Sequence, residues 1–264
     1  LKEFGFAPRI YKAGAYEDYF KRLFYYYVES GIPMVVTLDG NDVGHAIVCI
    51  GHSQQITDIQ SKEINDLYII NSADFHEHYV IMDDNQIPYA VQKYSELSVY
   101  DNIEIDSIIV PLYKRIFLEA GYAEAFTFQT LTNSYFGVKK SLEEYDIEER
   151  YSKDNPVVVR LFLTSSRSYK TFRSTNHGHP SLGEIYTHLP MPKFVWVAEI
   201  SLKDLFLQEK IFGEIIIDAT ATDSTGVDSL VAIHYPGYFG YRLPNEPVTR
   251  IFDMLLQPPH NVQR

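Results

Sequence analysis

The chain has 264 residues, of which 45% are hydrophobic and 22% charged, and its formal net charge at pH 7 is −12. The hydrophobic and charged fractions are typical of a globular protein. Nucleic acid is not expected as a partner of this acidic chain, because phosphate recognition needs a basic surface. The single cysteine excludes a disulfide framework within the chain and a cysteine-rich zinc module.

Membrane and secretion signals are also missing from the sequence. No apolar run approaches the roughly 18–20 residues that span a bilayer, and no basic segment followed by an apolar one opens the chain. We therefore expect no membrane partner and a cytoplasmic location. The chain begins with Leu1 rather than Met, which suggests that the natural protein extends upstream.

The first part of the chain predicts one helix followed by several strands. Aromatic and leucine side chains recur at three- and four-residue spacing over residues 15–30, and Gly31 and Pro33 end this amphipathic helix. Short apolar runs bounded by turn-forming residues then predict strands over residues 33–38, 44–50, 66–71, 78–82 and 107–112.

The second part predicts a mixture of helices and strands. Helical patterns cover residues 113–130 and 134–151, and strands are expected at residues 157–163, 193–200, 213–221 and 230–234. The hydroxyl-rich, cationic stretch that follows the first of these strands is interpreted as a solvated loop. We expect an N-terminal module of residues 1–112 and an accessory α+β region of residues 113–264.

His45 is the strongest functional candidate. It opens an apolar strand in the step Gly44-His45-Ala46, directly after a turn, and Asp83 follows the apolar run of residues 79–82. A histidine that opens one strand and a carboxylate that closes a neighbouring strand can form a general base with its orienting partner. The sequence therefore predicts that His45 and Asp83 lie together.

The order of these features resembles papain-like cysteine peptidases, and in particular the bacterial branch that includes the double-glycine leader peptidases of bacteriocin exporters. The resemblance rests on residues 30–38, the Gly44-His45-Ala46 step and Asp83, and it covers roughly residues 1–89. It implies an α+β fold with an antiparallel sheet and hydrolysis of a peptide or amide bond, with no cofactor and no metal. His45 is then the general base and Asp83 the orienting residue, with Asp84, Asn85 and Asn71 as alternatives.

The nucleophile of that family is a cysteine at the start of a helix upstream of the histidine, and residues 1–44 contain no cysteine. Cys49 lies four residues beyond His45 on the same strand, which separates the two backbones by about 13 Å. We expect Cys49 to be a small buried hydrophobe. The nucleophile is therefore either supplied upstream of Leu1 or lost.

Two other functions are possible. A non-catalytic binding protein on a degenerate papain-like fold would use an aromatic cleft or the cationic patch of Arg167, Lys170 and Arg173. A metal-dependent hydrolase would use His76 and His78, which share one face of a strand with Asp74. Two further candidates are a metal loop containing His177 and His179 and an Asp218–His234 pair.

Overall fold

The computed structural model describes residues 3, 5–14, 17–40, 43–97, 103–133, 137–144, 150–175, 180–222, 227–242 and 262–263. The architecture is mixed α+β and divides into two compact units. The first unit comprises Leu1–Ile59 and Ala73–Ile116, and the second comprises Gln60–Ser72 and Phe117–Arg264. None of the helices in the described residues is long and apolar enough to cross a membrane.

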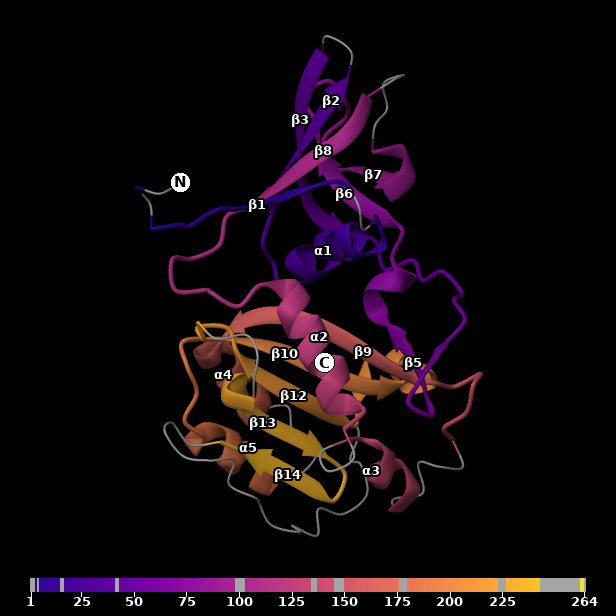
Figure 1. Ribbon diagram of the computed structural model, residues 1–264, viewed down its shortest axis with the longest axis vertical. Helices are drawn as coiled ribbons and strands as arrows, with labels where there is room; N and C mark the ends of the chain where they lie inside the picture. Colours follow the sequence, from indigo (N-terminus) through magenta and orange to yellow (C-terminus); the bar gives the residue numbers. More distant parts are fainter. Residues whose placement is uncertain are drawn as a thin grey trace. The chain divides into compact units, whose positions relative to one another are not determined.

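The first unit is built on a six-stranded sheet in the order β1-β8-β2-β3-β6-β7, and all of its strand pairs are antiparallel. Helix α1 (Glu17–Glu29) lies against one face of this sheet (Figure 1). The strands are β1 (Arg9–Lys12), β2 (Met34–Gly40), β3 (Val43–His52), β6 (His78–Met82), β7 (Ala90–Lys93) and β8 (Ile103–Val110). The 3-10 helix η3 covers Tyr94–Glu96, and the 3-10 helix η2 (Ser72–Phe75) begins at the last residue of the second unit's Gln60–Ser72 segment and continues into the first unit. The antiparallel sheet expected in the N-terminal part is thus present.

The sequence pattern explains how α1 and β2 pack. Leu23 and Phe24 of α1 are fully buried, and the helix ends where Gly31 adopts a φ of 69°, a conformation that favours glycine. In β2 the burial alternates with a period of two residues, and Met34, for example, is 1% exposed. This alternation gives the sheet one buried face, which α1 covers.

The second unit is built on a seven-stranded sheet in the order β14-β13-β12-β10-β9-β5-β4. Its strands are β4 (Lys62–Ile64), β5 (Leu67–Asn71), β9 (Val157–Ser165), β10 (Phe194–Leu202), β12 (Gly213–Asp218), β13 (Leu230–Tyr235) and β14 (Tyr238–Tyr241), and β11 (Lys210–Ile211) pairs separately with β15 (Val262–Gln263). Its helices are α2 (Ala120–Leu131), α3 (Lys139–Glu144), α4 (Ser166–Thr175), α5 (Pro180–His188) and α6 (Lys203–Phe206), and η4 covers Val227–Ser229.

One strand pair of this sheet is parallel and joins distant parts of the chain. β5 pairs in parallel with β9, while β4 and β5 form an antiparallel pair. Residues 60–72 therefore belong to the second unit. The expected division is into residues 1–112 and 113–264. In the structure the chain passes into the second unit at Gln60, returns to the first unit at Ala73 and passes to the second unit again after Ile116.

The stretch interpreted as a solvated loop is a helix, and that interpretation was wrong. α4 begins after Ser165, whose hydroxyl accepts a hydrogen bond from the backbone N–H of Ser168 at 3.1 Å. This is the contact of a helix N-cap. Tyr169 and Arg173, one turn apart on the same face of α4, are both buried.

Candidate functional site

His45 and Asp83 form a hydrogen-bonded pair in the first unit. The distance from His45 Nε2 to Asp83 Oδ1 is 2.9 Å, and the two side chains are 17% and 3% exposed. β3 and β6 are adjacent and antiparallel with Val48 opposite Met82, so the start of β3 lies near the residue that follows β6. The predicted proximity of His45 and Asp83 is confirmed.

The carboxyl group of Asp83 is held in its charged form. Burial by itself raises the pKa of Asp83, but the backbone N–H of Asn85, which donates to Oδ1 at 2.9 Å, and the ring of His45 lower it. The net result is a pKa below the ordinary value for aspartate. An ionised carboxylate can only accept, so Nε2 of His45 donates to it, and a neutral ring then has its basic lone pair on Nδ1.

The three alternatives to Asp83 are Asp84, Asn85 and Asn71, and the contact that each of them makes differs from the His45–Asp83 hydrogen bond. Asp84 Oδ1 is 3.9 Å from Nε2 of His45, and its side chain is 86% exposed. Asn85 contributes its backbone N–H to Asp83. Asn71 ends β5 in the second unit, where its side-chain amide donates to Glu124 at 3.0 Å. By geometry, Asp83 is therefore the hydrogen-bond partner of His45.

Cys49 is buried, as predicted. Its side chain is 0% exposed, and its thiol lies 3.7 Å from the backbone oxygen of Gly51. Burial raises the pKa of the Cys49 thiol to about 12, despite the opposing effect of that backbone contact. A thiol in this environment is not deprotonated near neutral pH, so the single cysteine of the chain does not supply a nucleophile.

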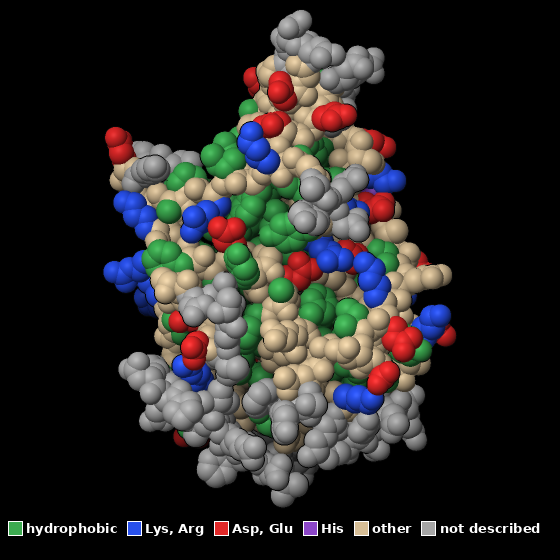
Figure 2. Space-filling view, in the orientation of Figure 1, with side chains coloured by type: hydrophobic (Ala, Val, Ile, Leu, Met, Phe, Trp, Pro, Cys, Tyr) green, Lys and Arg blue, Asp and Glu red, His purple; other side chains and the backbone are tan. Residues whose placement is uncertain are grey.

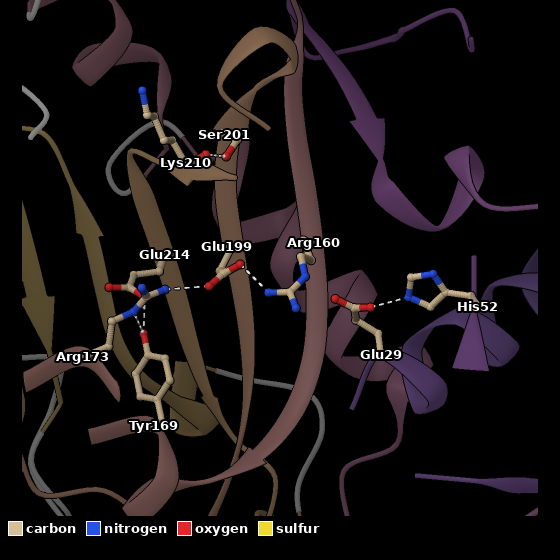
Figure 3. Close-up of polar contacts among 9 residues, drawn as sticks. All are labelled: Glu29, His52, Arg160, Tyr169, Arg173, Glu199, Ser201, Lys210 and Glu214. Carbon is tan, nitrogen blue, oxygen red and sulfur yellow. Dashed lines mark hydrogen bonds and ion pairs between the residues drawn. The ribbon is translucent and has the colours of Figure 1, made fainter. Parts of the chain in front are cut away.

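A second group of histidines has structural partners in the first unit. His52 Nε2 lies 2.5 Å from Glu29 Oε2 (Figure 3), and His52 Nδ1 lies 3.0 Å from the backbone oxygen of Ser53. His76 Nδ1 contacts the same oxygen at 3.1 Å, and the His76 ring stacks on Tyr25.

The alternative metal cluster of His76, His78 and Asp74 is not formed among the described residues. Asp74 makes a two-point ion pair with Arg22 at 2.8 and 3.0 Å. In the described part of the chain, the group that brings together three metal-ligating atoms is instead His45, Asp83 and Asp84. Asp74 does not share a strand face with the two histidines, because it lies in the 3-10 helix η2, which ends just before His76.

The second unit contains a buried row of charged residues. Arg160 on β9, Glu199 on β10, Glu214 on β12 and His234 on β13 are successive cross-strand partners. Figure 3 shows Arg173 of α4 directed at the two carboxylates, with Nη2 2.6 Å from Glu199 and Nε 3.0 Å from Glu214. Arg160 donates to the other oxygen of Glu199 at 2.6 Å.

This charge cluster is almost completely removed from water. Arg173, Glu199 and Glu214 have side chains that are 1–3% exposed. The hydroxyl groups of Tyr169 and Tyr186 donate to Glu214. Burial raises the pKa of Glu214, but the positive charge of Arg173 and the hydrogen bonds that Glu214 accepts lower this pKa to about 2. Glu214 is therefore ionised inside the protein.

Sequence reasoning did not find Glu199 and Glu214 as interacting residues. Each glutamate interrupts an apolar strand, in Val197-Ala198-Glu199-Ile200 and in Gly213-Glu214-Ile215-Ile216. A charged residue inside a strand that is apolar on both faces is the signal that could have identified them, since such a strand is buried and its charges need partners.

Two further candidates are changed by the structure. Arg173 is buried in ion pairs, so Arg167, Lys170 and Arg173 do not form an exposed cationic patch. Asp218 accepts hydrogen bonds from Thr220, while His234 Nδ1 lies 3.8 Å from Glu214, so Asp218 and His234 do not form a pair. His177 and His179 lie outside the described residues.

In comparisons with known proteins, no family model, no curated protein and no solved structure matches this chain.

Proposed function

We propose that the first unit is a cysteine-peptidase-like module that acts on peptide or amide bonds, with His45 as general base and Asp83 as its orienting residue. The observation that supports this proposal is the 2.9 Å contact between His45 Nε2 and Asp83 Oδ1. The position of His45 at the start of β3, beside the end of β6, is the arrangement expected from the resemblance to papain-like peptidases.

The proposed mechanism follows from the direction of this hydrogen bond. Because Nε2–H is directed at Asp83, the ring accepts a proton at Nδ1. Transfer of a thiol proton to Nδ1 gives a thiolate, which attacks the carbonyl carbon and forms a tetrahedral intermediate. His45 then returns this proton to the leaving nitrogen, and the resulting thioester is hydrolysed by a water molecule that His45 deprotonates. Asp83 remains ionised and stabilises the imidazolium.

The proposal requires a cysteine outside the 264 residues of this chain, since its single cysteine is buried at position 49. If such a thiol is supplied upstream of Leu1, the module cleaves its substrate. If the thiol has been lost, the same fold would bind peptides without cleaving them. These two outcomes differ in one measurable property, the formation of a covalent thioester.

The test uses the natural full-length protein with a library of fluorogenic peptide amides and a thiol-directed alkylating probe. Replacing the general base in His45→Gln is expected to lower the hydrolysis rate by about 10²–10⁴-fold. His188→Gln is the matched control, because His188 is exposed at the end of α5 in the second unit, and it should retain the wild-type rate. Absence of both hydrolysis and probe labelling would refute the peptidase and favour the binding protein.

The dyad itself can be tested without substrate. Long-range ¹H–¹⁵N correlation spectra distinguish the two neutral tautomers of a histidine ring. We expect the neutral ring of His45 to carry its proton on Nε2, and we expect Asp83→Ala to abolish this preference because the acceptor is removed. A wild-type ring protonated on Nδ1 would contradict the proposed orientation.

A further inference from the structure

The functional atoms of His45, Asp83 and Asp84 form a triangle that the peptidase mechanism does not fully use. Nε2 of His45 lies 2.9 Å from Asp83 Oδ1 and 3.9 Å from Asp84 Oδ1, and one ligand atom from each of the three residues lies within 4.8 Å of the others. Imidazole nitrogen and carboxylate oxygen are the ligands of many zinc-type sites.

Two sides of this triangle have lengths close to the ligand separations of a metal site. Ligands at 2.0–2.2 Å from a tetrahedral ion are about 3.4 Å from one another. The two measured separations from Nε2, 2.9 and 3.9 Å, lie on either side of that value. The side chain of Asp84 is 86% exposed, so it can rotate toward an ion. The side chain of Asp83 is 3% exposed, and its Oδ1 accepts the backbone N–H of Asn85 at 2.9 Å, so Asp83 provides a fixed ligand.

The charge of the surroundings also favours a cation. Gly44, the neighbour of His45, pairs with Asp39, and Asp39 pairs on its other side with Glu104 of β8. Both of these acidic residues are exposed. In Figure 2 several acidic side chains lie over the region of β2, β3 and β8, with a basic side chain below them. Clustered negative charge raises the local concentration of cations.

We propose that His45, Asp83 and Asp84 bind a divalent transition metal ion of the zinc class. His45 coordinates the ion through Nε2, so its ring proton lies on Nδ1, and solvent completes the coordination on the side of the exposed Asp84. Such an ion replaces the His45–Asp83 hydrogen bond and removes the lone pair on Nδ1 that the peptidase mechanism needs. The ion therefore inhibits the proposed activity, while its binding does not depend on that activity.

The experiment is a calorimetric titration of the chelator-treated protein with Zn²⁺ and, separately, with Mg²⁺. We expect one Zn²⁺ ion per chain at this site, and no measurable heat with Mg²⁺, which prefers an all-oxygen octahedral site. His45→Ala and Asp84→Asn should each weaken Zn²⁺ binding at least about tenfold. Glu104→Gln removes a nearby exposed charge that is not a ligand, so its effect should stay below about threefold.

A spectroscopic measurement separates this site from binding elsewhere. Co²⁺ added to the wild-type protein should give visible bands of a site without sulfur, and these bands should be lost in His45→Ala. Zn²⁺ affinity that is unchanged in both His45→Ala and Asp84→Asn would overturn the proposal, and so would a thiolate-to-cobalt charge-transfer band. Circular dichroism of each variant verifies folding. Because heat and absorbance are measured, failure of the peptidase proposal leaves this test unaffected.

Discussion

Glu199 and Glu214 are direct cross-strand partners on β10 and β12, and the single guanidinium of Arg173 binds both carboxylates. Like charges directly opposite each other destabilise a sheet, and buried charges without partners are costly. Arg173 therefore compensates two carboxylates at once, and Arg160 provides a second positive charge at Glu199. Through Arg173 this ion-pair network connects α4 to β10 and β12.

Replacing Arg173 by methionine is expected to lower the free energy of unfolding by about 3–5 kcal/mol, because two buried carboxylates lose their shared partner. The measurement is chemical denaturation followed by circular dichroism. Arg167→Met on the same helix is the matched control, since Arg167 is exposed, and its effect should stay within about 0.5 kcal/mol. Equal effects of the two variants would show that the network does not stabilise the fold.

Stability should also decrease in acid through Glu214. Its pKa in the folded state is lowered from 4.5 to about 2, so its contribution is complete above the ordinary pKa and is lost as the pH falls toward the folded value. Integrated over this range, the loss is about 3 kcal/mol. The free energy of unfolding measured from about pH 5 to pH 2 should decrease less steeply in Glu214→Gln than in the wild type. If the free energy of unfolding fell equally steeply with pH in the two proteins, Glu214 would not be the source of this loss.

The sequence predicted those features that depend on neighbouring elements. His45 and Asp83 lie at the ends of β3 and β6, which pair directly with each other, so their proximity followed from strand alternation and turns. The helical periodicity of α1 was equally visible. Both patterns are local and are produced by one buried face.

The features that it missed depend on distant parts of the chain. No local pattern indicates that β5 pairs in parallel with β9, which places residues 60–72 in the second unit. The composition of α4 resembles that of a solvated loop, and Arg173 is buried only because Glu199 and Glu214 come from two other strands. The ion-pair network and the helix therefore had to be found in the structure.

Cys49 should be chemically inert in the folded protein. Burial raises its pKa to about 12, so the thiolate fraction near neutral pH is roughly a thousandfold below that of a free cysteine. We expect alkylation by iodoacetamide to be slower by at least this factor in the native protein than in denaturant, with labelling followed by mass spectrometry. Rapid labelling of the native chain at Cys49 would show an accessible thiol and reopen its candidacy as a nucleophile.

A variant of Asn71 can show whether this residue stabilises the second unit or orients His45. Its amide donates to Glu124, and the two residues are 5% and 9% exposed. Asn71→Ala removes a donor from a buried carboxyl group, so the free energy of unfolding should fall by about 1–3 kcal/mol. Gln60→Ala, an exposed change in the same unit, should have almost no effect. The tautomer of His45 should be the same in Asn71→Ala as in the wild type, because Asp83 is its partner. A changed tautomer in Asn71→Ala, with Asp83 intact, would restore Asn71 as the orienting residue.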